Sequence, residues 1–273
     1  MGLYAGRILI YAVLIVGTLL TFGPFYWMAV SSLKPQGEIF AATLQLVPSQ
    51  PTLEHYRNLL ARTAFLRWTF NSIVFALGTT ALSLFFSTLA GFAFAKYEFR
   101  GKRMLFAIVL ASVSIPQFVT IIPIYGLMVK LGLTNTYWGL ILPFSVNALV
   151  IFLMRQYIAG IPSELLDAAR IDGSSEFGIF YRVIVPVIRP AMGAAGIFVF
   201  LNTWNQYLWP LIMVQSNDMM VAPVGLATLS TLYVIEYGQI MAGATLSTLP
   251  ILVLFVLMQE QFVAGLTSGA LKG

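Results

Sequence analysis

The sequence predicts an all-α membrane protein of six transmembrane helices, with a cytoplasmic helix–turn–helix loop between spans four and five. Its 273 residues are 59% hydrophobic and only 9% charged, and the mean hydropathy is +0.88. A soluble domain carries about a quarter charged residues, because its surface must face water. Most of the surface of this chain is therefore expected to face lipid or other protein.

The count of six spans comes from the length of the apolar runs. A helix that crosses the hydrocarbon core needs roughly 20 mostly apolar residues. The sixth run, Val183–Val214, contains a single charged residue, Arg189, near its start, where a long side chain can reach the interface. The other five runs contain no Lys, Arg, Asp or Glu, and they are Ile8–Leu33, Trp68–Ala95, Met104–Val129, Leu131–Met154 and Tyr237–Gln259.

Prolines recur inside these runs and predict kinked spans. In a soluble helix each of them would cost about 3 kcal/mol. Transmembrane helices tolerate proline because neighbouring helices and polar side chains satisfy the freed carbonyl groups. The prolines are Pro24, Pro116, Pro123, Pro143, Pro190, Pro210 and Pro250.

The distribution of basic residues predicts that both termini lie in the cytoplasm. In this arrangement nine Lys and Arg residues lie in cytoplasmic segments and five in external segments. The bias is strongest in the very short loop Lys96–Arg103, which has four basic residues, whereas Gln215–Glu236 has none. The first run is longer than the roughly 7–15 residues of a signal-peptide core, so we expect it to be a retained span.

The external segment Leu53–Trp68 predicts an amphipathic helix at the membrane interface. Apolar residues recur at helical spacing between Tyr56 and Ala64, and Trp68 is the expected interfacial anchor. Such a helix serves either as a membrane anchor or as a docking surface for an external protein. The single histidine, His55, lies in this polar stretch and is expected to be an ordinary surface residue.

The loop Arg155–Arg182 carries the signals that begin and end a helix. Pro162 suits the first turn, and Glu164 and Asp167 place negative charge near the positive end of the helix dipole. Gly173 falls where a left-handed residue would end the helix.

A second helix is expected to run from Ser174 toward Pro186, which completes a helix–turn–helix. Asp167 and Arg170 could orient a partner by charge-assisted hydrogen bonds. An ordinary surface helix has similar features, so these residues alone leave a docking role open. The first helix has an expected apolar side made of Leu165, Ala168, Ala169 and Ile171.

The run from Ile161 to Gly173, followed by Ile184-Val185-Pro186 and Pro190, resembles the EAA loop of permease subunits in bacterial ATP-binding-cassette importers. In that family the loop forms coupling helices that sit in a cleft of the ATPase subunit. Asp167-Ala168-Ala169 matches the Glu-Ala-Ala of the motif, with aspartate in place of glutamate. The resemblance implies a coupling loop at about 157–182, with ATPase-coupling residues Glu164, Asp167, Ala168, Ala169, Arg170, Asp172 and Gly173.

Other segments resemble the carbohydrate-importer branch of this family. They are Asn71-Ser72, Trp204–Pro210 and the terminal Gly265–Gly273. The resemblance implies a single transmembrane permease domain over residues 1–273. It also implies a cytoplasmic C-terminal tail, at about 262–273, that reaches the ATPase.

The resemblance further implies the partners and the location. These are a second permease subunit that completes a heterodimer, two ATPase subunits and an external solute-binding protein, at the plasma (inner) membrane of a bacterium or archaeon. The chain has no Gly-x-x-x-x-Gly-Lys-Ser/Thr sequence, so ATP and Mg are expected on the ATPase subunits. We assign no catalytic residue, cofactor or metal to this chain. Its other expected contact is membrane lipid, not nucleic acid, because the basic residues punctuate apolar runs.

Polar side chains inside the spans are the candidates for contact with a transported solute. Trp204, Asn205 and Tyr207 combine an amide with aromatic rings, a combination that suits the hydroxyl groups and the apolar faces of a sugar, and we predict that they face the substrate pathway. The alternative is interhelical hydrogen bonding, worth about 0.6 kcal/mol on average. A sugar, a polyol and glycerol phosphate all remain possible solutes. The amides within the runs are Gln117, Asn147, Asn202, Asn205 and Gln206.

Two functions of other classes fit the sequence less well. An ion-coupled transporter needs ionisable residues at mid-membrane, and the runs offer only Arg189 and the nearby Glu260. A membrane-embedded enzyme needs clustered His, Asp, Glu or Ser at membrane depth, but no acidic pair lies inside a run. The chain has no cysteine, which excludes a disulfide framework and a thiolate metal site.

Overall fold

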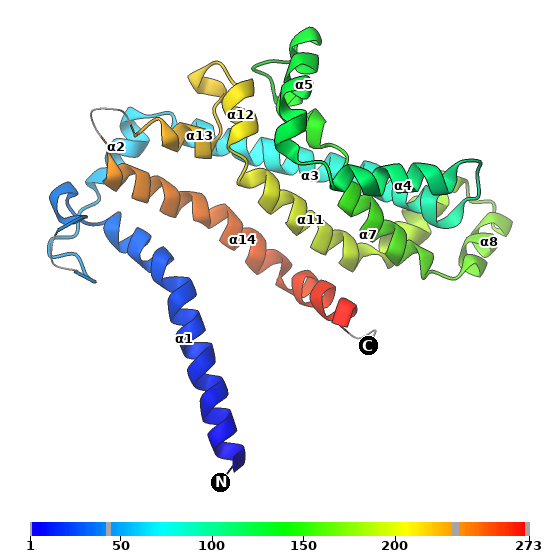
Figure 1. The fold of residues 1–273 in the computed structure, drawn as a ribbon, viewed down its shortest axis with the longest axis horizontal. Helices are drawn as coiled ribbons and strands as arrows, with labels where there is room; N and C mark the ends of the chain where they lie inside the picture. The colour runs from blue at the N-terminus through cyan, green and yellow to red at the C-terminus, as the bar shows by residue number, and fades with distance from the viewer. Residues whose placement is uncertain (1, 42–44, 231–234, 271–273) are drawn as a thin grey trace. The chain divides into compact units, whose positions relative to one another are not determined.

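The computed structural model describes residues 2–41, 45–230 and 235–270, and it describes side chains for 6–7, 9–41, 45–230 and 235–259. Over these residues the chain is helical, and no strand longer than an isolated bridge is present (Figure 1). The helices are α1 (Gly2–Ser31), α2 (Glu54–Arg62), α3 (Phe65–Lys96), α4 (Lys102–Val113), α5 (Gln117–Lys130), α6 (Tyr137–Ile141), α7 (Ala148–Ala159), α8 (Ser163–Ile171), α9 (Glu176–Ile179), α10 (Val185–Val187), α11 (Arg189–Trp204), α12 (Leu208–Met213), α13 (Ala222–Ala227) and α14 (Tyr237–Ala270).

Three of the helices are long and apolar enough to cross a membrane on their own. The qualifying segments are Leu9–Ser31, Phe65–Lys96 and Tyr237–Gln259. Three further spans arise if each bent pair of helices counts as one: α4 with α5, bent by 105°; α6 with α7, bent by 49°; and the helical segment Glu176–Val187 with α11, bent by 82°. The described part of the chain therefore provides three membrane helices, or up to six.

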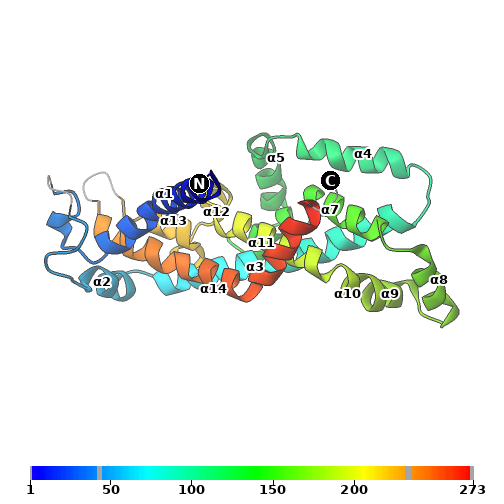
Figure 2. The same ribbon diagram turned by 90° about the horizontal axis from the view of Figure 1, so that it is seen from below.

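The breaks lie at or near prolines, as the sequence predicts, but they are sharper than kinks. The helices α4 and α5 meet at a sharp bend (Figure 2). Between them Pro116 has φ −59° and ψ 131°, an extended backbone conformation that does not continue the first helix. The bend before α11 lies at Ile188, two residues ahead of Pro190. A proline has no N–H to donate and clashes with the carbonyl four residues earlier, so both sites leave the α-helical path.

Two predicted spans are also shorter as helices than the apolar runs that suggested them. The run Leu131–Met154 is not helical before Tyr137, because Gly132 and Asn135 have positive φ values of 66° and 56°. The run Val183–Val214 is divided where α11 ends at Trp204 and α12 begins four residues later. Hydropathy marks the membrane-embedded chain and does not distinguish a continuous helix from one that turns inside the apolar layer.

The chain forms two compact units. One consists of residues 1–69 and 222–250, and the other of residues 70–221 and 251–273. The helices α3 and α14 each contribute to both units. The single permease domain over residues 1–273 stays a prediction, and residues 271–273 of the expected C-terminal tail lie outside the described residues.

The first unit contains an amphipathic helix, α2, within the segment where the sequence predicts one. It ends at Arg62 because Thr63 is extended, so Trp68 belongs to α3 instead of anchoring α2. The Trp68 side chain is only 2% exposed and packs over Gly225, where a Cβ would approach the indole to 2.2 Å. The prediction that Trp68 is an interfacial anchor is therefore wrong, because glycine leaves room for the ring in the core of this unit.

The expectation of a surface histidine is also wrong. His55 is 6% exposed, and its Nε2 lies 2.8 Å from the carbonyl oxygen of Lys34. Lys34 is itself fully buried, donates from Nζ to the carbonyl of Gln45 at 2.7 Å and lies over the Trp27 ring. Both polar side chains can be buried without a large free-energy cost, because each has a hydrogen-bond partner in the backbone.

The second unit has a continuous apolar core where α3, α7 and α11 meet. Phe92 of α3, Met154 and Ile158 of α7 and Ala195 of α11 are buried in one cluster. The same cluster includes residues of the segment between α7 and α11, namely Ile161, Leu166, Ile179, Phe180, Ile184 and Ile188. The loop that the sequence singles out is thus packed onto its own spans.

Candidate functional site

The first half of the loop is the helix α8, whose ends follow from local sequence. Pro162 precedes it, and Glu164 lies in its first turn. After Asp172 the chain turns through Gly173, which has φ +79°. The amide of Gly173 donates to the carbonyl of Arg170 at 3.0 Å, and the amide of Ser174 donates to that of Ala169 at 2.9 Å. This pair of hydrogen bonds is a Schellman motif, so the turn lies where the sequence predicts it.

The second half of the loop is helical from Glu176 to Val187, two residues later than expected from Ser174. Ser175 caps the beginning of this helix, because its hydroxyl accepts a hydrogen bond from the amide of Gly178 at 3.1 Å. Between α9 and α10 the segment Phe180–Ile184 forms one π-helical turn. Two helical arms therefore leave the Gly173 turn.

Three of the four residues of the expected apolar side of α8 are exposed, and the fourth packs against the core. Leu166 is buried in the core of the unit, and Ala169 packs against the same cluster. Leu165 and Ala168 are exposed, and Ile171 is 87% exposed. Leu165, Ala168 and Ile171 therefore lie on an exposed apolar face, whereas Ala169, three positions from Leu166, helps to seat the helix on the core.

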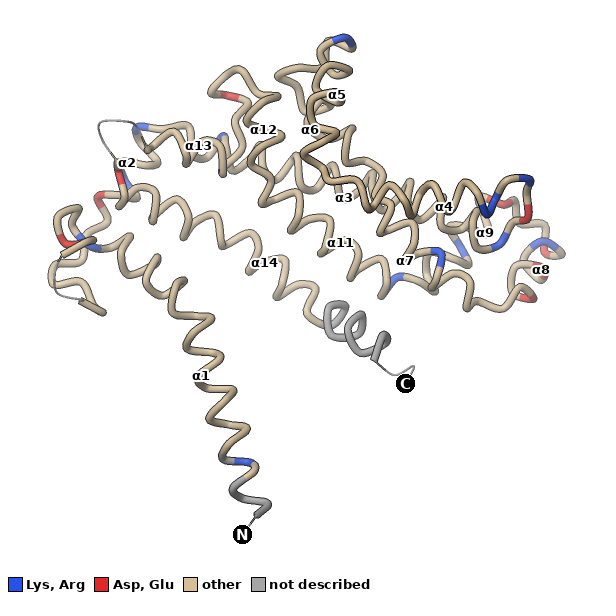
Figure 3. Tube along the Cα trace, viewed as in Figure 1, with Lys and Arg blue, Asp and Glu red and all other residues tan. Residues whose placement is uncertain are grey.

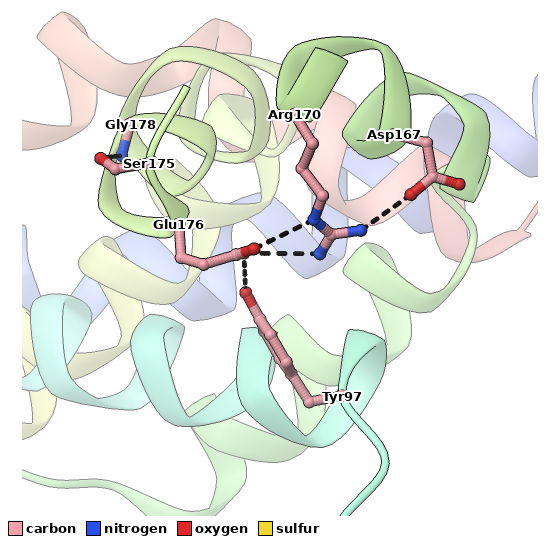
Figure 4. Close-up of polar contacts among 6 residues, drawn as sticks. All are labelled: Tyr97, Asp167, Arg170, Ser175, Glu176 and Gly178. Carbon is pink, nitrogen blue, oxygen red and sulfur yellow. Dashed lines mark hydrogen bonds and ion pairs between the residues drawn. The ribbon is translucent and has the colours of Figure 1, made fainter. Parts of the chain in front are cut away.

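A polar network crosses the turn (Figure 4). Arg170 donates from Nη1 to Asp167 at 2.8 Å and from Nε to Glu176 at 3.0 Å. The Tyr97 hydroxyl donates to the other oxygen of the Glu176 carboxylate. Asp167 and Arg170 are thus paired with each other inside this chain.

The network changes the acidity of its members. Arg170, and after it Tyr97, holds the pKa of the Glu176 carboxyl below its ordinary value of 4.5. Burial, followed by the hydrogen bond to the negative Glu176, raises the pKa of Tyr97 to about 12. The pKa of Arg170 is raised by its hydrogen bonds to Glu176 and Asp167. All three groups therefore keep the charge states that the network requires over a wide pH range.

Two residues at the end of α3 form hydrogen bonds on either side of α8 and its Gly173 turn. Lys96, the last residue of α3, donates from Nζ to the carbonyl of Ile161, just before α8. The next residue, Tyr97, binds Glu176 just after the turn. Beneath them the rings of Phe92 and Phe180 lie with centroids 5.9 Å apart. We call Lys96 and Tyr97 the α3 clamp.

The remaining residues expected in the loop point outward. Glu164 and Asp172 are exposed and make no side-chain hydrogen bond within the described residues. Basic and acidic residues gather around α8, α9 and the start of α4 (Figure 3). Sequence reasoning missed Lys96, Tyr97 and Glu176 as parts of the site. The one signal in the sequence that could have indicated them was their polarity, since Lys96 and Tyr97 follow the second apolar run and Glu176 lies in the loop.

The amides inside the spans converge on three adjoining cavities within the second unit. The cavities have volumes of about 430, 480 and 170 Å³, and Gln117 lines all of them. The first is lined by Asn202, Asn205 and Gln206 together with apolar residues. Asn147 lines the second and third. Among the residues that the structure describes, no charged side chain lines any of the three, and we call them the amide cavities.

The structure separates the three residues that the sequence grouped as facing a pathway. Asn205 lines the 430 Å³ cavity and donates from Nδ2 to the carbonyl of Leu201 at 2.8 Å. Trp204 is 4% exposed and stacks on Phe200 in an apolar cluster, with centroids 5.7 Å apart. Tyr207 is exposed and is not among the residues that line the amide cavities.

Comparison with known proteins points to one family. Residues 84–268 match the family described as the binding-protein-dependent transport system inner membrane component. The chain is 39% identical to the arabinooligosaccharides transport system permease protein AraQ of Bacillus subtilis, over 94% of this chain and 92% of that one. It is 35% identical to the lactose transport system permease protein LacG of Rhizobium radiobacter, over 94% and 93%.

The fold is also similar to a solved structure. The crystal structure of a bacterial ABC transporter involved in the import of the acidic polysaccharide alginate includes a chain that matches with a TM-score of 0.85. The match covers 95% of this chain and 97% of that chain, at 23% sequence identity. At that identity the similarity concerns the fold.

Proposed function

Since this chain belongs to the family of binding-protein-dependent transport system inner membrane components, in its carbohydrate-importer branch, we propose that it is one of two permease subunits that form a sugar pathway. The second permease is a related chain, so the pair is a heterodimer. An external solute-binding protein delivers the sugar, and two ATPase subunits bind ATP and Mg and drive import. The chain is a multi-pass membrane protein. In the proposal the three bent pairs add one span each to the three long helices, which gives six, and residues 176–182 of the third pair belong to the cytoplasmic loop.

The observation that carries the proposal is the convergence of the in-span amides on the amide cavities. Amides both donate and accept hydrogen bonds, so they suit the hydroxyl groups of a sugar. The linings have no charged side chain among the described residues. A phosphate ester would require a cationic partner at membrane depth. The linings therefore favour a neutral sugar or polyol over glycerol phosphate.

The geometry of the α8 turn supports the proposed link to the ATPase. Leu165, Ala168 and Ile171 leave an apolar face exposed at the tip of a loop that is packed onto its spans. A buried base and an exposed apolar tip are what a docking element requires. In the proposal this face contacts the ATPase, with Glu164 and Asp172 beside it. ATP binding then moves α8, and the α3 clamp passes the movement to the spans.

The proposed orientation places the α8 turn and both termini in the cytoplasm. Single cysteines at Gly101 and Asn217 test it in this cysteine-free chain. A membrane-impermeant thiol reagent applied to intact cells is expected to label the cysteine at Asn217 and to spare the one at Gly101. The reverse pattern would place α8 outside and contradict the link to the ATPase.

Transport in reconstituted vesicles tests the function itself. The complete importer, with the binding protein and ATP, is supplied with radiolabelled arabinooligosaccharide, lactose, a polyol or glycerol 3-phosphate. We expect ATP-dependent uptake of at least one neutral sugar and none of glycerol 3-phosphate. ATP-dependent uptake of glycerol 3-phosphate alone would contradict the assignment of a neutral solute.

A further inference from the structure

A basic cavity lies at the start of α4, away from the amide cavities. Its volume is about 560 Å³. The lining carries three cationic side chains and one carboxylate, which leaves a net charge of +2. The lining residues are Glu98, Phe99, Gly101, Lys102, Arg103, Met104 and Arg155.

The charges of this cavity are only partly paired. Lys102 forms an ion pair with Glu98 at 2.8 Å, so these two charges cancel. Arg103 is exposed and has no hydrogen bond or ion pair within the described residues. Arg155 lies with its guanidinium 4.3 Å from the centroid of the Phe106 ring, and its Nε is buried without a hydrogen-bond partner. A buried unpaired N–H of a cation is costly, and an anion bound in the cavity would remove that cost.

The backbone at this place adds further donors. The helix α4 has 12 residues and begins after Gly101, which has φ +83°. No side chain caps its first amides, and no acidic residue lies in its first turn. The positive end of the helix dipole therefore lies at the cavity with no acidic residue in its own first turn, and the one carboxylate of the lining, Glu98, is already paired with Lys102.

An exposed apolar helix face continues from the cavity. Met104, Leu105 and Ile108 of α4 are all exposed. In a chain that crosses the membrane, this places a cationic cavity at the end of a surface suited to acyl chains. A soluble phosphate would use the cations alone, whereas a phospholipid would use both features.

We propose that this cavity binds the phosphate group of an anionic phospholipid, held by Arg103, Arg155 and the first amides of α4, with acyl chains along Met104, Leu105 and Ile108. The site is independent of the solute pathway. Basic cavities between transmembrane helices are suited to lipid head groups, because the local dielectric is low and the charges are fixed. The proposed lipid site gives the basic loop Lys96–Arg103 a binding role in addition to its effect on membrane orientation.

Native mass spectrometry of the complete importer tests the site with short-chain phosphatidylglycerol, short-chain phosphatidylcholine and inorganic phosphate as probes. Arg155→Gln and Arg103→Gln each remove a proposed ligand. Arg100→Gln is the matched control, because Arg100 lies in the same loop, is exposed and does not line the cavity. We expect Arg155→Gln to weaken binding of phosphatidylglycerol about tenfold, Arg103→Gln less, and Arg100→Gln by less than about twofold.

Three results would overturn the proposal. Equal losses in the Arg100 and Arg103 variants would show that net charge alone attracts the lipid. Equal binding of phosphatidylcholine and phosphatidylglycerol by the parent complex would exclude an anionic head-group site. Displacement of phosphatidylglycerol by millimolar inorganic phosphate would assign the cavity to a soluble phosphate. The exposed Arg103 variant decides the test if Arg155→Gln fails to assemble.

Discussion

The hydroxyl of Tyr97 donates a hydrogen bond to the carboxylate of Glu176, and this contact joins the end of α3 to the beginning of α9 across 79 residues of sequence. It is one of the two contacts of the α3 clamp. In the other contact, Lys96 donates a hydrogen bond to the carbonyl of Ile161. The proposed coupling loop is therefore attached to the end of α3 on both sides of its turn. In the proposal these two contacts transmit a displacement of α8 to α3.

Removing the Tyr97 hydroxyl is expected to weaken coupling while the loop stays folded. A hydrogen bond to a charged group is worth about 1.5–3 kcal/mol when buried and less at an exposed site. In Tyr97→Phe we therefore expect sugar-stimulated ATP hydrolysis to fall roughly two- to tenfold, with unstimulated hydrolysis retained. Tyr181→Phe is the matched control, because Tyr181 is exposed and its hydroxyl has no hydrogen bond within the described residues. Equal stimulation in both variants would show that the clamp does not transmit motion.

The acidity of Glu176 predicts how the loop responds to acid. Its pKa is held below 4.5 in the folded loop, so the carboxylate contributes stability above that pH. The contribution is lost as the pH falls through the lowered folded value. A fluorophore on Ile171→Cys is expected to report a rigid loop at pH 5 and release of the loop well below pH 4.5.

Glu176→Gln is the control for this acid transition. Its amide cannot ionise, so the variant should be looser than the parent at neutral pH and should lack the transition. A transition of the same midpoint in the variant would assign it to another carboxyl group. The side chains of Arg170 and Glu176 are 40% and 52% exposed, so we expect this ion pair to have only the small effect of a solvent-screened surface pair.

Substitutions at the α8 turn should rank by backbone strain. A Cβ at Gly173 would meet no atom within 4 Å, so its positive φ is the whole cost of a substitution. A left-handed non-glycine residue costs about 1–2 kcal/mol, and a β-branched one more. We expect ATPase pull-down and stimulated hydrolysis to fall most in Gly173→Val, less in Asp167→Ala and least in Asp167→Glu. Gly173→Asn should approach the parent, since asparagine tolerates this conformation; a loss equal to that of valine would contradict the strain argument.

The amide cavities predict which in-span substitutions alter transport. Asn205→Leu removes a polar group from a cavity lining and should lower the sugar uptake of reconstituted vesicles about tenfold or more, with assembly and ATP binding retained. Trp204→Phe should lower the thermal stability of the complex, because Trp204 is packed on Phe200 in an apolar cluster. Uptake that is unchanged in the Asn205 variant would make the amide a structural hydrogen bonder.

The parts of this structure that depend on local chemistry could be predicted from the sequence. Pro162 marks the beginning of α8 and Gly173 marks its end, because each residue restricts or permits the conformation of its own backbone. Apolar runs identify membrane-embedded chain, since the lipid core sets their length. The orientation, which rests on the excess of basic residues in the expected cytoplasmic loops, stays a prediction.

The parts that depend on distant packing could not be predicted. Tyr97 and Glu176 meet only after α3, α7 and the loop share a core, and nothing in either neighbourhood specifies the other. Trp68 resembles an interfacial anchor until Gly225 is known to make room for it. Trp204 and Asn205 are adjacent in sequence, but only the asparagine lines an amide cavity.

The central claim is that the tip of α8 contacts the ATPase, and photo-cross-linking from Ile171 tests it most directly. A cysteine-linked diazirine is placed at Ile171→Cys in this cysteine-free chain, with Leu46→Cys as an exposed control far along the sequence. In the complete importer we expect the Ile171 probe to cross-link to the ATPase subunit, with a yield that changes on ATP binding, and the Leu46 probe not to do so. An Ile171 probe that labels lipid or nothing, under conditions in which the complex still transports sugar, would contradict the account.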